Sequence, residues 1–261
     1  MVSACSIAGS DSGGGAGIQA DLKTFTALEV FGLTVITAVT AQNTREVRGV
    51  WMLPSGAVRT QIETVADEFA IGAWKTGMLG CAATVRAVAE ALPRGAALVI
   101  DPVMISTSGH RLLDEDAVQD LVELLIPRAE IVTPNIPEAE VLSGMQVRTP
   151  DDMAEAGRRI LDLGAGTVVV KGGHLAGDTV VDILVDCDGV AEISGRRYPY
   201  PVHGSGCCLS AALTAYLARG MDARGAFAAA REFIDTAIGQ ATGDPGTLWI
   251  VNPGGLNIRR H

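Results

Sequence analysis

Short apolar runs alternate with segments of helical period along most of this 261-residue chain. The runs are rich in β-branched and other apolar side chains, which predicts buried strands. These strands cover residues 5–8, 33–41, 71–76, 96–100, 131–133 and 167–171. Between them, apolar positions three and four residues apart predict helices. The predicted helices cover residues 18–28, 54–69, 84–92, 117–125 and 151–163, and two more begin near residues 209 and 223.

Regular alternation of strand and helix indicates a mainly parallel central sheet with helices on both faces, an α/β fold. Residues 180–185 and 190–193 flank a turn at residues 187–189, which predicts one antiparallel pair of strands. The chain has no internal repeat, low-complexity tract or long polar linker. We therefore expect one domain that spans residues 1–261.

Composition narrows the class of protein. The net charge of −10 argues against nucleic acid as the main partner, although a few glycine amides and one lysine suffice to hold a nucleotide. The five cysteines are odd in number and show no CxxC spacing, so we expect neither a zinc site nor a disulfide framework. No apolar run reaches about 18 residues and residues 1–8 lack a basic segment, which predicts no membrane association and a cytoplasmic protein.

Polar or glycine-rich clusters follow the predicted strands. They cover residues 9–11, 42–44, 75–77, 101–102, 133–135 and 171–173. A single cluster of this kind is most simply a turn. Ligands of open α/β sheets bind beyond the carboxyl ends of the strands, however, so six clusters at such ends predict a shared cleft.

A second glycine-rich turn, residues 202–208, leads directly into an apolar, alanine-rich helix. Backbone N–H groups and the helix N-terminus would favour phosphate or a developing phosphoryl anion there. We expect Gly204, Ser205, Gly206 and Cys207 to form this anion site, with the thiolate of Cys207 favoured and able to act as a base. The alternative is a tight loop whose glycines only allow the helix to pack.

The first glycine-rich loop, residues 9–17, fits neither a Walker A motif nor a dinucleotide fingerprint, because the lysine and the glycine spacing are missing. It would still let a small ligand approach the backbone closely. Asp21, near the start of the next helix, could cap that helix or bind a ligand hydroxyl. The Gln42 side chain carries a hydrogen-bond donor and an acceptor, so it could form two hydrogen bonds with the edge of a nitrogen heterocycle. Met78 could cover a flat ring or simply fill the core.

Three charged residues near strand ends suit a nucleotide and its metal. Asp101 and Glu138 are candidates for Mg²⁺, although Glu138 could instead cap a helix. Lys171 follows a very apolar strand and could neutralise a phosphate, or lie extended at the sheet edge. Phosphoryl transfer needs alignment, charge neutralisation and a base near the acceptor hydroxyl, and these candidates supply all three.

Seven ordered motifs resemble those of the hydroxymethylpyrimidine/phosphomethylpyrimidine kinases of thiamine biosynthesis. They are residues 8–24 (AGSDSGGGAGIQADLKT), 40–44 (TAQNT), 75–79 (KTGML), 101–104 (DPVM), 133–135 (TPN), 171–174 (KGGH) and 203–207 (HGSGC). The resemblance covers about residues 3–240. It implies a ribokinase-like fold and transfer of the ATP γ-phosphate to the hydroxymethyl group of the pyrimidine, followed by phosphorylation of the monophosphate.

The resemblance also implies a role for each site residue. Ala16, Asp21, Gln42, Met78 and Val103 would line the pyrimidine site. Residues 204–207 would form the anion hole, with Cys207 catalytic. Lys171 and Asn135 would lie on the nucleotide side, and Asp101 and Glu138 at the metal.

The resemblance further implies a homodimer that uses ATP and Mg²⁺. Ser205, Cys208, Thr107 and His110 differ from the residues usual in the family, and these changes fall around the phosphates. Two alternatives remain: a pyridoxal kinase, which the retained TAQNT motif disfavours, and a non-catalytic pyrimidine-binding protein.

Overall fold

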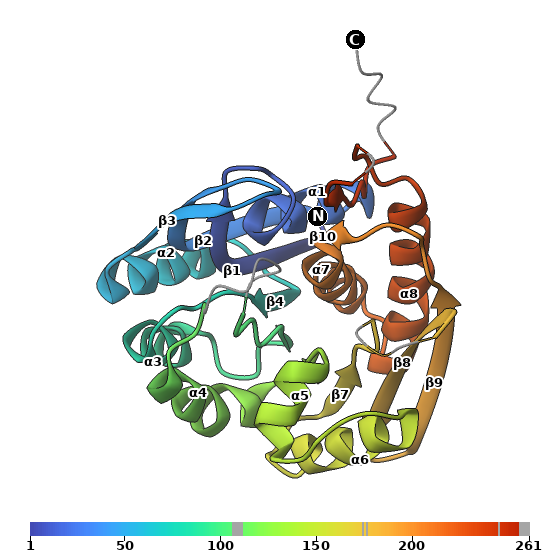
Figure 1. The fold of residues 1–261 in the computed structure, drawn as a ribbon. Coiled ribbons are helices and arrows are strands. Elements are labelled where there is room, and N and C mark those ends of the chain that lie inside the picture. The colour runs from blue at the N-terminus through green and yellow to red at the C-terminus, as the bar shows by residue number, and fades with distance from the viewer. Residues whose placement is uncertain (106–111, 174, 176, 245, 256–261) are drawn as a thin grey trace.

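A computed structural model describes residues 1–105, 112–173, 175, 177–244 and 246–255, and its centre is a nine-stranded sheet (Figure 1). The strands are β1 (Ser3–Asp11), β2 (Phe31–Gln42), β3 (Val47–Met52), β4 (Ala73–Thr76), β5 (Leu98–Ile100), β6 (Ile131–Val132), β7 (Thr167–Val170), β8 (Thr179–Asp186) and β9 (Gly189–Arg196). Their order across the sheet is β3-β2-β1-β4-β5-β6-β7-β8-β9. A separate parallel pair joins β10 (Val202–His203) to β11 (Trp249–Ile250).

The six strands that the apolar runs predict form the continuous parallel part of the sheet, from β2 through β1, β4, β5 and β6 to β7. The antiparallel pair β8 and β9 is also confirmed. The sequence did not predict β3, which pairs antiparallel with β2 at the sheet edge. None of its positions is buried, so it lacks the apolar alternation that marks a half-buried strand.

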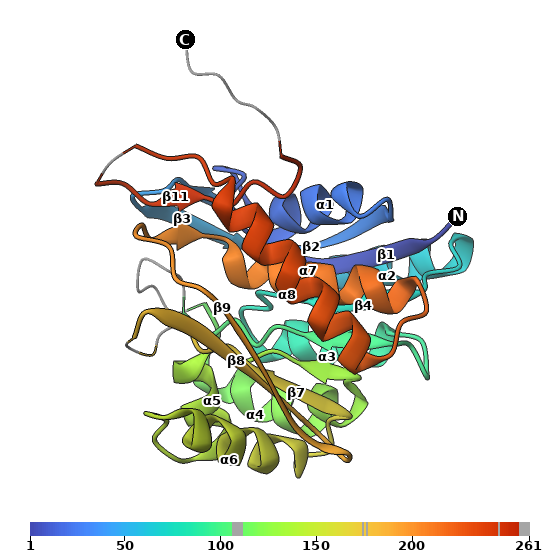
Figure 2. The ribbon, with the colours of Figure 1, turned by 90° about the vertical axis from the view of Figure 1, so that its right-hand side faces the viewer.

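Helices form a layer on each face of the sheet (Figures 1 and 2). They are α1 (Gly17–Ala27), α2 (Ser55–Glu68), α3 (Ala82–Ala91), α4 (Glu115–Asp120), α5 (Ile136–Ser143), α6 (Pro150–Leu161), α7 (Ser205–Ala218) and α8 (Ala223–Gly239). Helices α1, α7 and α8 cover one face, and α2 to α6 cover the other. The α/β architecture with a mainly parallel sheet and helices on both faces is therefore confirmed.

Burial on both faces explains why the strands read as continuous apolar runs. Successive strand residues point to opposite faces, so Ala73 of β4 packs in the core beneath α1 and α7 while Trp74 packs in the core beneath α2 and α3. Val99 and Leu98 of β5 divide between the two cores in the same way. Each core is apolar, so polar alternation along these strands would bury unpaired groups.

Several predicted boundaries are wrong in ways that bear on function. Strand β1 continues to Asp11, so the first three residues of the predicted glycine loop belong to the sheet. Helix α7 begins at Ser205, four residues earlier than expected. Helix α5 was not predicted at all, although Asn135 and Glu138 form a capping box at its start. On α2, Val58 and Ile62 are buried.

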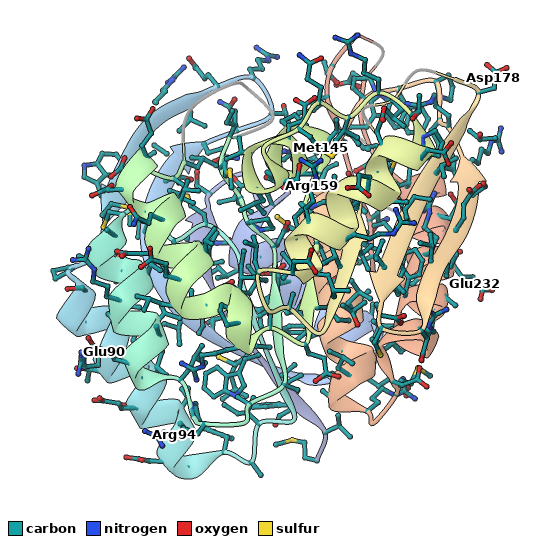
Figure 3. The ribbon with its side chains drawn as sticks, turned by 90° about the horizontal axis from the view of Figure 1, so that it is seen from below. Glu90, Arg94, Met145, Arg159, Asp178 and Glu232 are labelled. Carbon is teal, nitrogen blue, oxygen red and sulfur yellow. The ribbon has the colours of Figure 1, made fainter. Side chains whose placement is uncertain are left out.

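Many charged side chains lie on the outside of the molecule. Glu90, Arg94, Arg159 and Glu232 are exposed and point away from the sheet when the molecule is seen from below (Figure 3). Within the described ranges, no helix combines the length and the apolar character needed to cross a bilayer.

Candidate active site

The six polar clusters lie together, as the sequence predicts, because the strands that precede them are parallel neighbours. They border a cavity of about 680 Å³, and every one of the six contributes to its lining. The first turn of α7 lines the same cavity. The lining includes these sequence-predicted residues: Ala16, Gln42, Met78, Asp101, Val103, Asn135, Glu138, Lys171, Gly204, Ser205, Gly206 and Cys207.

Two helix N-termini meet at the cavity. Ala16 is the N-cap of α1 and Gly204 is the N-cap of α7. Gly204 has φ +86°, and a Cβ at this position would lie 1.8 Å from the carbonyl oxygen of Gly15. Only glycine therefore allows the two helix starts to come this close. The dipoles and first-turn N–H groups of the two helices favour an anion in the same place.

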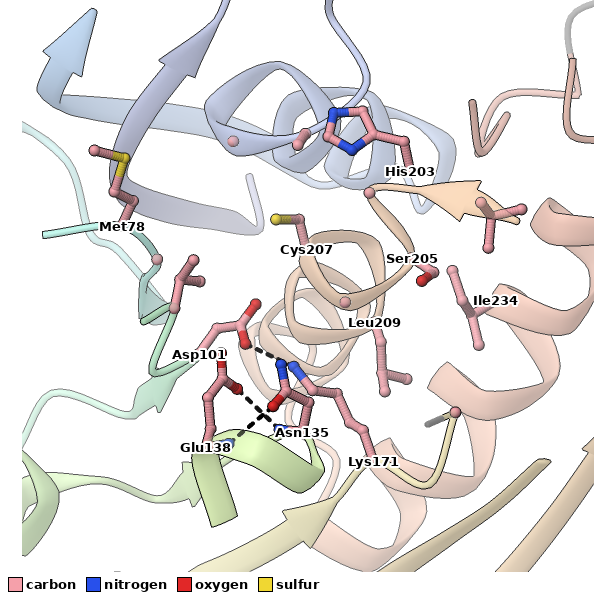
Figure 4. Close-up of a pocket in the computed structure, with 18 of the residues that line it drawn as sticks. Met78, Asp101, Asn135, Glu138, Lys171, His203, Ser205, Cys207, Leu209 and Ile234 are labelled. Atoms are coloured by element: carbon pink, nitrogen blue, oxygen red, sulfur yellow. Dashed lines mark hydrogen bonds and ion pairs between the residues drawn. The ribbon is translucent and has the colours of Figure 1, made fainter. Parts of the chain in front are cut away.

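Cys207 lies in the first turn of α7 rather than in the loop before it. Figure 4 shows its Sγ pointing from the helix toward the side of the cavity that holds Met78. Burial raises the pKa of this thiol to about 11, although the ammonium group of Lys75 and a backbone hydrogen bond from Gly17 act in the opposite direction. The expectation of a favoured thiolate is therefore wrong for the protein without ligand, because desolvation outweighs the cation and the helix dipole.

Asp21 does not line the cavity, so the structure does not bring it together with the other residues expected at the pyrimidine site. It is fully buried in the middle of α1, where it neither caps the helix nor reaches the cavity. Its carboxylate accepts hydrogen bonds from Ser6 Oγ at 2.5 Å and from Lys75 Nζ at 2.9 Å. Its structural role is to neutralise a buried lysine.

Lys75 is a cavity residue to which sequence reasoning gave no role. It lies at the end of β4 on the sheet face beneath α1 and α7, and its side chain is fully buried. Burial alone would lower its pKa, but the negative charge of Asp21 and the neighbouring Cys207 and Asp101 raise the pKa above its usual value. The ammonium group of Lys75 is therefore charged, and it lies beneath the expected anion site. The signal in the sequence was a lysine inside an apolar strand, which requires a partner.

Asp101 and Lys171 form an ion pair at the opposite wall, with Lys171 Nζ 2.7 Å from Asp101 Oδ1 (Figure 4). Ser210 of α7 donates to Asp101 Oδ2 at 3.1 Å. Burial raises the pKa of Asp101, but Lys171 and Lys75 lower it further, so the carboxylate is ionised. A Cβ on Gly206 would lie 3.3 Å from Lys171 Nζ, which places this ammonium group against the first turn of α7.

Glu138 caps a helix, one of the two roles that the sequence left open. It closes the capping box of α5 (Figure 4). Glu138 Oε2 accepts a hydrogen bond from the Asn135 backbone N–H at 2.9 Å, and the Asn135 side chain accepts one from the Glu138 backbone N–H. Glu138 also lines the cavity near Asp101 and Lys171. Burial raises its pKa to about 7, with Lys171 lowering and Asp101 raising it.

Two carboxylates fit a magnesium ion. Mg²⁺ prefers oxygen ligands and usually takes one or two carboxylates together with water and substrate phosphates. Asp101 and Glu138 supply such oxygens on one cavity wall. Among the residues that the structure describes, no group of three or more metal-ligating side chains occurs, so a metal here would need ligands from the nucleotide or water.

The other end of the cavity is an apolar lobe that the sequence did not reveal. Leu209, Ile234 and Ile238 line it together with the aromatic rings of Tyr198 and Tyr200. Figure 4 shows Leu209 and Ile234 beside Ser205, on the far side of α7 from Met78. Residues from α7, α8 and the segment after β9 lie together here. The lobe depends on how these elements pack against one another, so no pattern of neighbouring residues could indicate it. Thr107 and His110 lie outside the described residues.

The layered fold, the paired helix N-termini and the cationic and acidic walls define a phosphotransferase of the ribokinase-like class. The sequence profile of the family described as phosphomethylpyrimidine kinase matches residues 11–246. The chain belongs to this family.

Relatives and solved structures agree with this assignment. The chain is 46% identical over 241 residues to the hydroxymethylpyrimidine/phosphomethylpyrimidine kinase of Rhizobium meliloti, which covers 91% of each chain. It resembles the crystal structure of phosphomethylpyrimidine kinase from Clostridium difficile, with 43% identity, a TM-score of 0.81 and coverage of 91% of this chain and 100% of that one. It also resembles the ADP complex of Bacillus subtilis pyridoxal kinase, with 38% identity, a TM-score of 0.88 and coverage of 99% and 100%.

Proposed function

We propose that this protein phosphorylates 4-amino-5-hydroxymethyl-2-methylpyrimidine and then its monophosphate, with ATP and Mg²⁺, in thiamine biosynthesis. One observation carries the proposal: an amide that suits an aminopyrimidine, Gln42, and an anion site at the start of α7 line the same cavity. A kinase for this substrate needs both features close enough together that one bound substrate reaches them both. The relatives named above support the substrate class.

Gln42, Met78, Val103 and Ala16 would hold the pyrimidine. The Gln42 side chain offers an acceptor beside a donor, which matches the amino group and the adjacent ring nitrogen. Met78 and Val103 supply apolar surface for the faces of the ring.

The nucleotide would occupy the remainder of the cavity, with its base in the apolar lobe near Leu209 and Ile234. Lys171 and the N–H groups of residues 204–207 would bind the phosphates, and Asn135 would lie beside them. Asp101 and Glu138 would hold Mg²⁺, which when bound neutralises charge on the transferred phosphoryl group. The ADP complex of the Bacillus subtilis relative supports a nucleotide in this fold.

In the transfer step, the hydroxymethyl oxygen bonds to the γ-phosphorus as the bond from that phosphorus to the β–γ bridging oxygen breaks. The hydroxyl proton passes to the Cys207 thiolate. Because the pKa of this thiol is about 11 without ligand, only a small fraction is ionised at neutral pH. Lys75 and the two helix N-termini favour the ionised form and the growing phosphoryl charge alike.

A pyridoxal kinase is the second candidate function, favoured by the similarity to the Bacillus subtilis pyridoxal kinase. Pyridoxal lacks the amino group beside a ring nitrogen, so it would leave Gln42 without its polar match. For this reason we assign the aminopyrimidine as the main substrate.

We further propose a cytoplasmic homodimer. Edge strand β3 exposes Val50, Trp51 and Met52 in succession, and Val39, which pairs with Trp51 from β2, is exposed as well. An exposed apolar edge of this kind is suited to pairing with a second copy.

The decisive experiment is an ADP-release assay with ATP and Mg²⁺ and three acceptors: hydroxymethylpyrimidine, its monophosphate and pyridoxal. Turnover of both pyrimidines, with pyridoxal much slower, is the expected result. Turnover of pyridoxal alone would make the protein a pyridoxal kinase. No turnover of any acceptor, with the pyrimidine still bound, would contradict the catalytic proposal.

A further inference from the structure

Three polar side chains from distant parts of the chain meet at the pyrimidine end of the cavity. His203 Nε2 lies 3.1 Å from Asp11 Oδ2 and 3.3 Å from Gln42 Nε2. Asp11 ends β1, Gln42 ends β2, and His203 precedes the N-cap of α7. The side chains of His203 and Asp11 are 8% and 4% exposed, so water competes little for these contacts. All three residues line the cavity.

Asp11 acts only as an acceptor. Its carboxylate accepts the backbone N–H groups of Gly13 at 2.8 Å, Gly15 at 3.1 Å and Ala16 at 2.8 Å. Burial raises its pKa, but the hydrogen bonds from His203 and from these amides lower it further, and the pKa lies below its usual value. An ionised carboxylate cannot donate, so His203 Nε2 must carry the proton that lies between them.

Thr40 imposes the opposite requirement. Its hydroxyl donates to the Ser10 carbonyl oxygen at 2.8 Å, and it lies 3.4 Å from Gln42 Oε1. A hydroxyl has one proton, so toward Gln42 it can only accept.

The two neighbours therefore select one orientation of the amide. The protonated Nε2 of His203 has no lone pair and can only share its one N–H between Asp11 and Gln42, which calls for the oxygen of Gln42. Thr40 presents an acceptor, which calls for the nitrogen of Gln42. A half-turn about the last side-chain torsion exchanges these atoms and leaves the side chain in place. We propose that His203, held by Asp11, is a positioning residue that fixes the Gln42 amide with Oε1 toward His203 and Nε2 toward Thr40.

This orientation decides how the substrate lies, and here the inference rests on the proposed function. The free lone pair of Oε1 lies on the His203 side and the free N–H on the Thr40 side. The pyrimidine amino group then lies toward His203 and the ring nitrogen toward Thr40. Because the hydroxymethyl group is on the carbon next to the amino-bearing carbon, it falls on the side of Gly204 and the anion site. The reverse orientation would direct it away.

Nitrogen-15 NMR of the imidazole rings tests the proton assignment without any substrate. We expect the proton of His203 to lie on Nε2 in the folded protein, and the signals of this ring are identified by their loss in His203→Gln. A ring that carries its proton only on Nδ1 would overturn the proposal. This result is independent of turnover, so it separates failure of the positioning role from failure of the proposed function.

Steady-state kinetics test the consequence for specificity. His203→Leu removes the donor and should raise the KM for hydroxymethylpyrimidine about tenfold, with a much smaller effect on kcat and on the KM for pyridoxal. In His203→Gln the amide nitrogen carries two protons and can donate to both Asp11 and Gln42, so the KM should return to within about threefold of the wild-type value. Equal losses for both acceptors, or no recovery in His203→Gln, would show that His203 is only structural.

Discussion

Under the proposed function, the ionisation of Cys207 governs the rate. If its thiolate is the base, the active fraction below the pKa of about 11 increases with pH. We therefore expect kcat/KM to rise about tenfold per pH unit between about pH 7 and 9. Cys207→Ala should lower turnover at least ~100-fold and abolish the slope, while pyrimidine binding persists. Measuring kcat/KM across this pH range for the wild type and for Cys207→Ala tests the prediction. Near-normal turnover of the variant would mean that the helix N-termini, and not Cys207, supply most of the catalysis.

Under the proposed function, Gln42 is the residue that distinguishes the aminopyrimidine from pyridoxal. Gln42→Met keeps the length of the side chain and removes its polar groups, so the aminopyrimidine loses its partner. We expect kcat/KM for hydroxymethylpyrimidine to fall by at least about tenfold more than that for pyridoxal. Competition between the two acceptors in one reaction measures the ratio directly. Equal losses of kcat/KM for the two acceptors would mean that Gln42 has only a structural role.

At the scale of the elements, the proposed anion site lies where α1 approaches α7. Gly204→Ala would place a Cβ against the Gly15 carbonyl oxygen and force the start of α7 to move. A displacement of about 1 Å can cost roughly a hundredfold in rate, so we expect kcat to fall by about that factor with a smaller change in pyrimidine affinity.

Gly220, just beyond the other end of α7, provides the matched control. Its φ of +88° is nearly that of Gly204, but a Cβ there would meet nothing within 4 Å. Gly220→Ala therefore introduces the same backbone strain without the clash, and it should lower stability with little effect on kcat. Similar kcat losses in both variants would contradict the role given to the close approach.

At the scale of the whole molecule, the nine-stranded sheet has two edges of different character. On β3, Val50, Trp51 and Met52 are exposed in succession, and Trp51 is 60% exposed. Light scattering should give the mass of a dimer for the wild type and of a monomer for Trp51→Lys. Val190→Lys, on the opposite edge strand β9, should leave the mass unchanged. A monomeric wild type would contradict the dimer.

The periodicity of the sequence predicted the six parallel strands and most of the helices because each face of the sheet is buried. It missed β3, which is not buried on either face, and α5, which has only eight residues. The glycine motifs correctly indicated a turn where backbones approach closely. Neither pattern contains information on which polar side chains meet across the cavity.

The sequence by itself determined the six parallel strands and most of the helices, the alignment of six polar strand ends at one edge, and the membership of a kinase family. Local apolar spacing and short motifs carry that information. Tertiary structure alone decided that Asp21 pairs with Lys75, that burial keeps Cys207 protonated, and that His203 meets Asp11, a residue 192 positions away. Protonation and hydrogen-bond direction depend on the groups that surround an atom in space, and those groups come from distant parts of the chain.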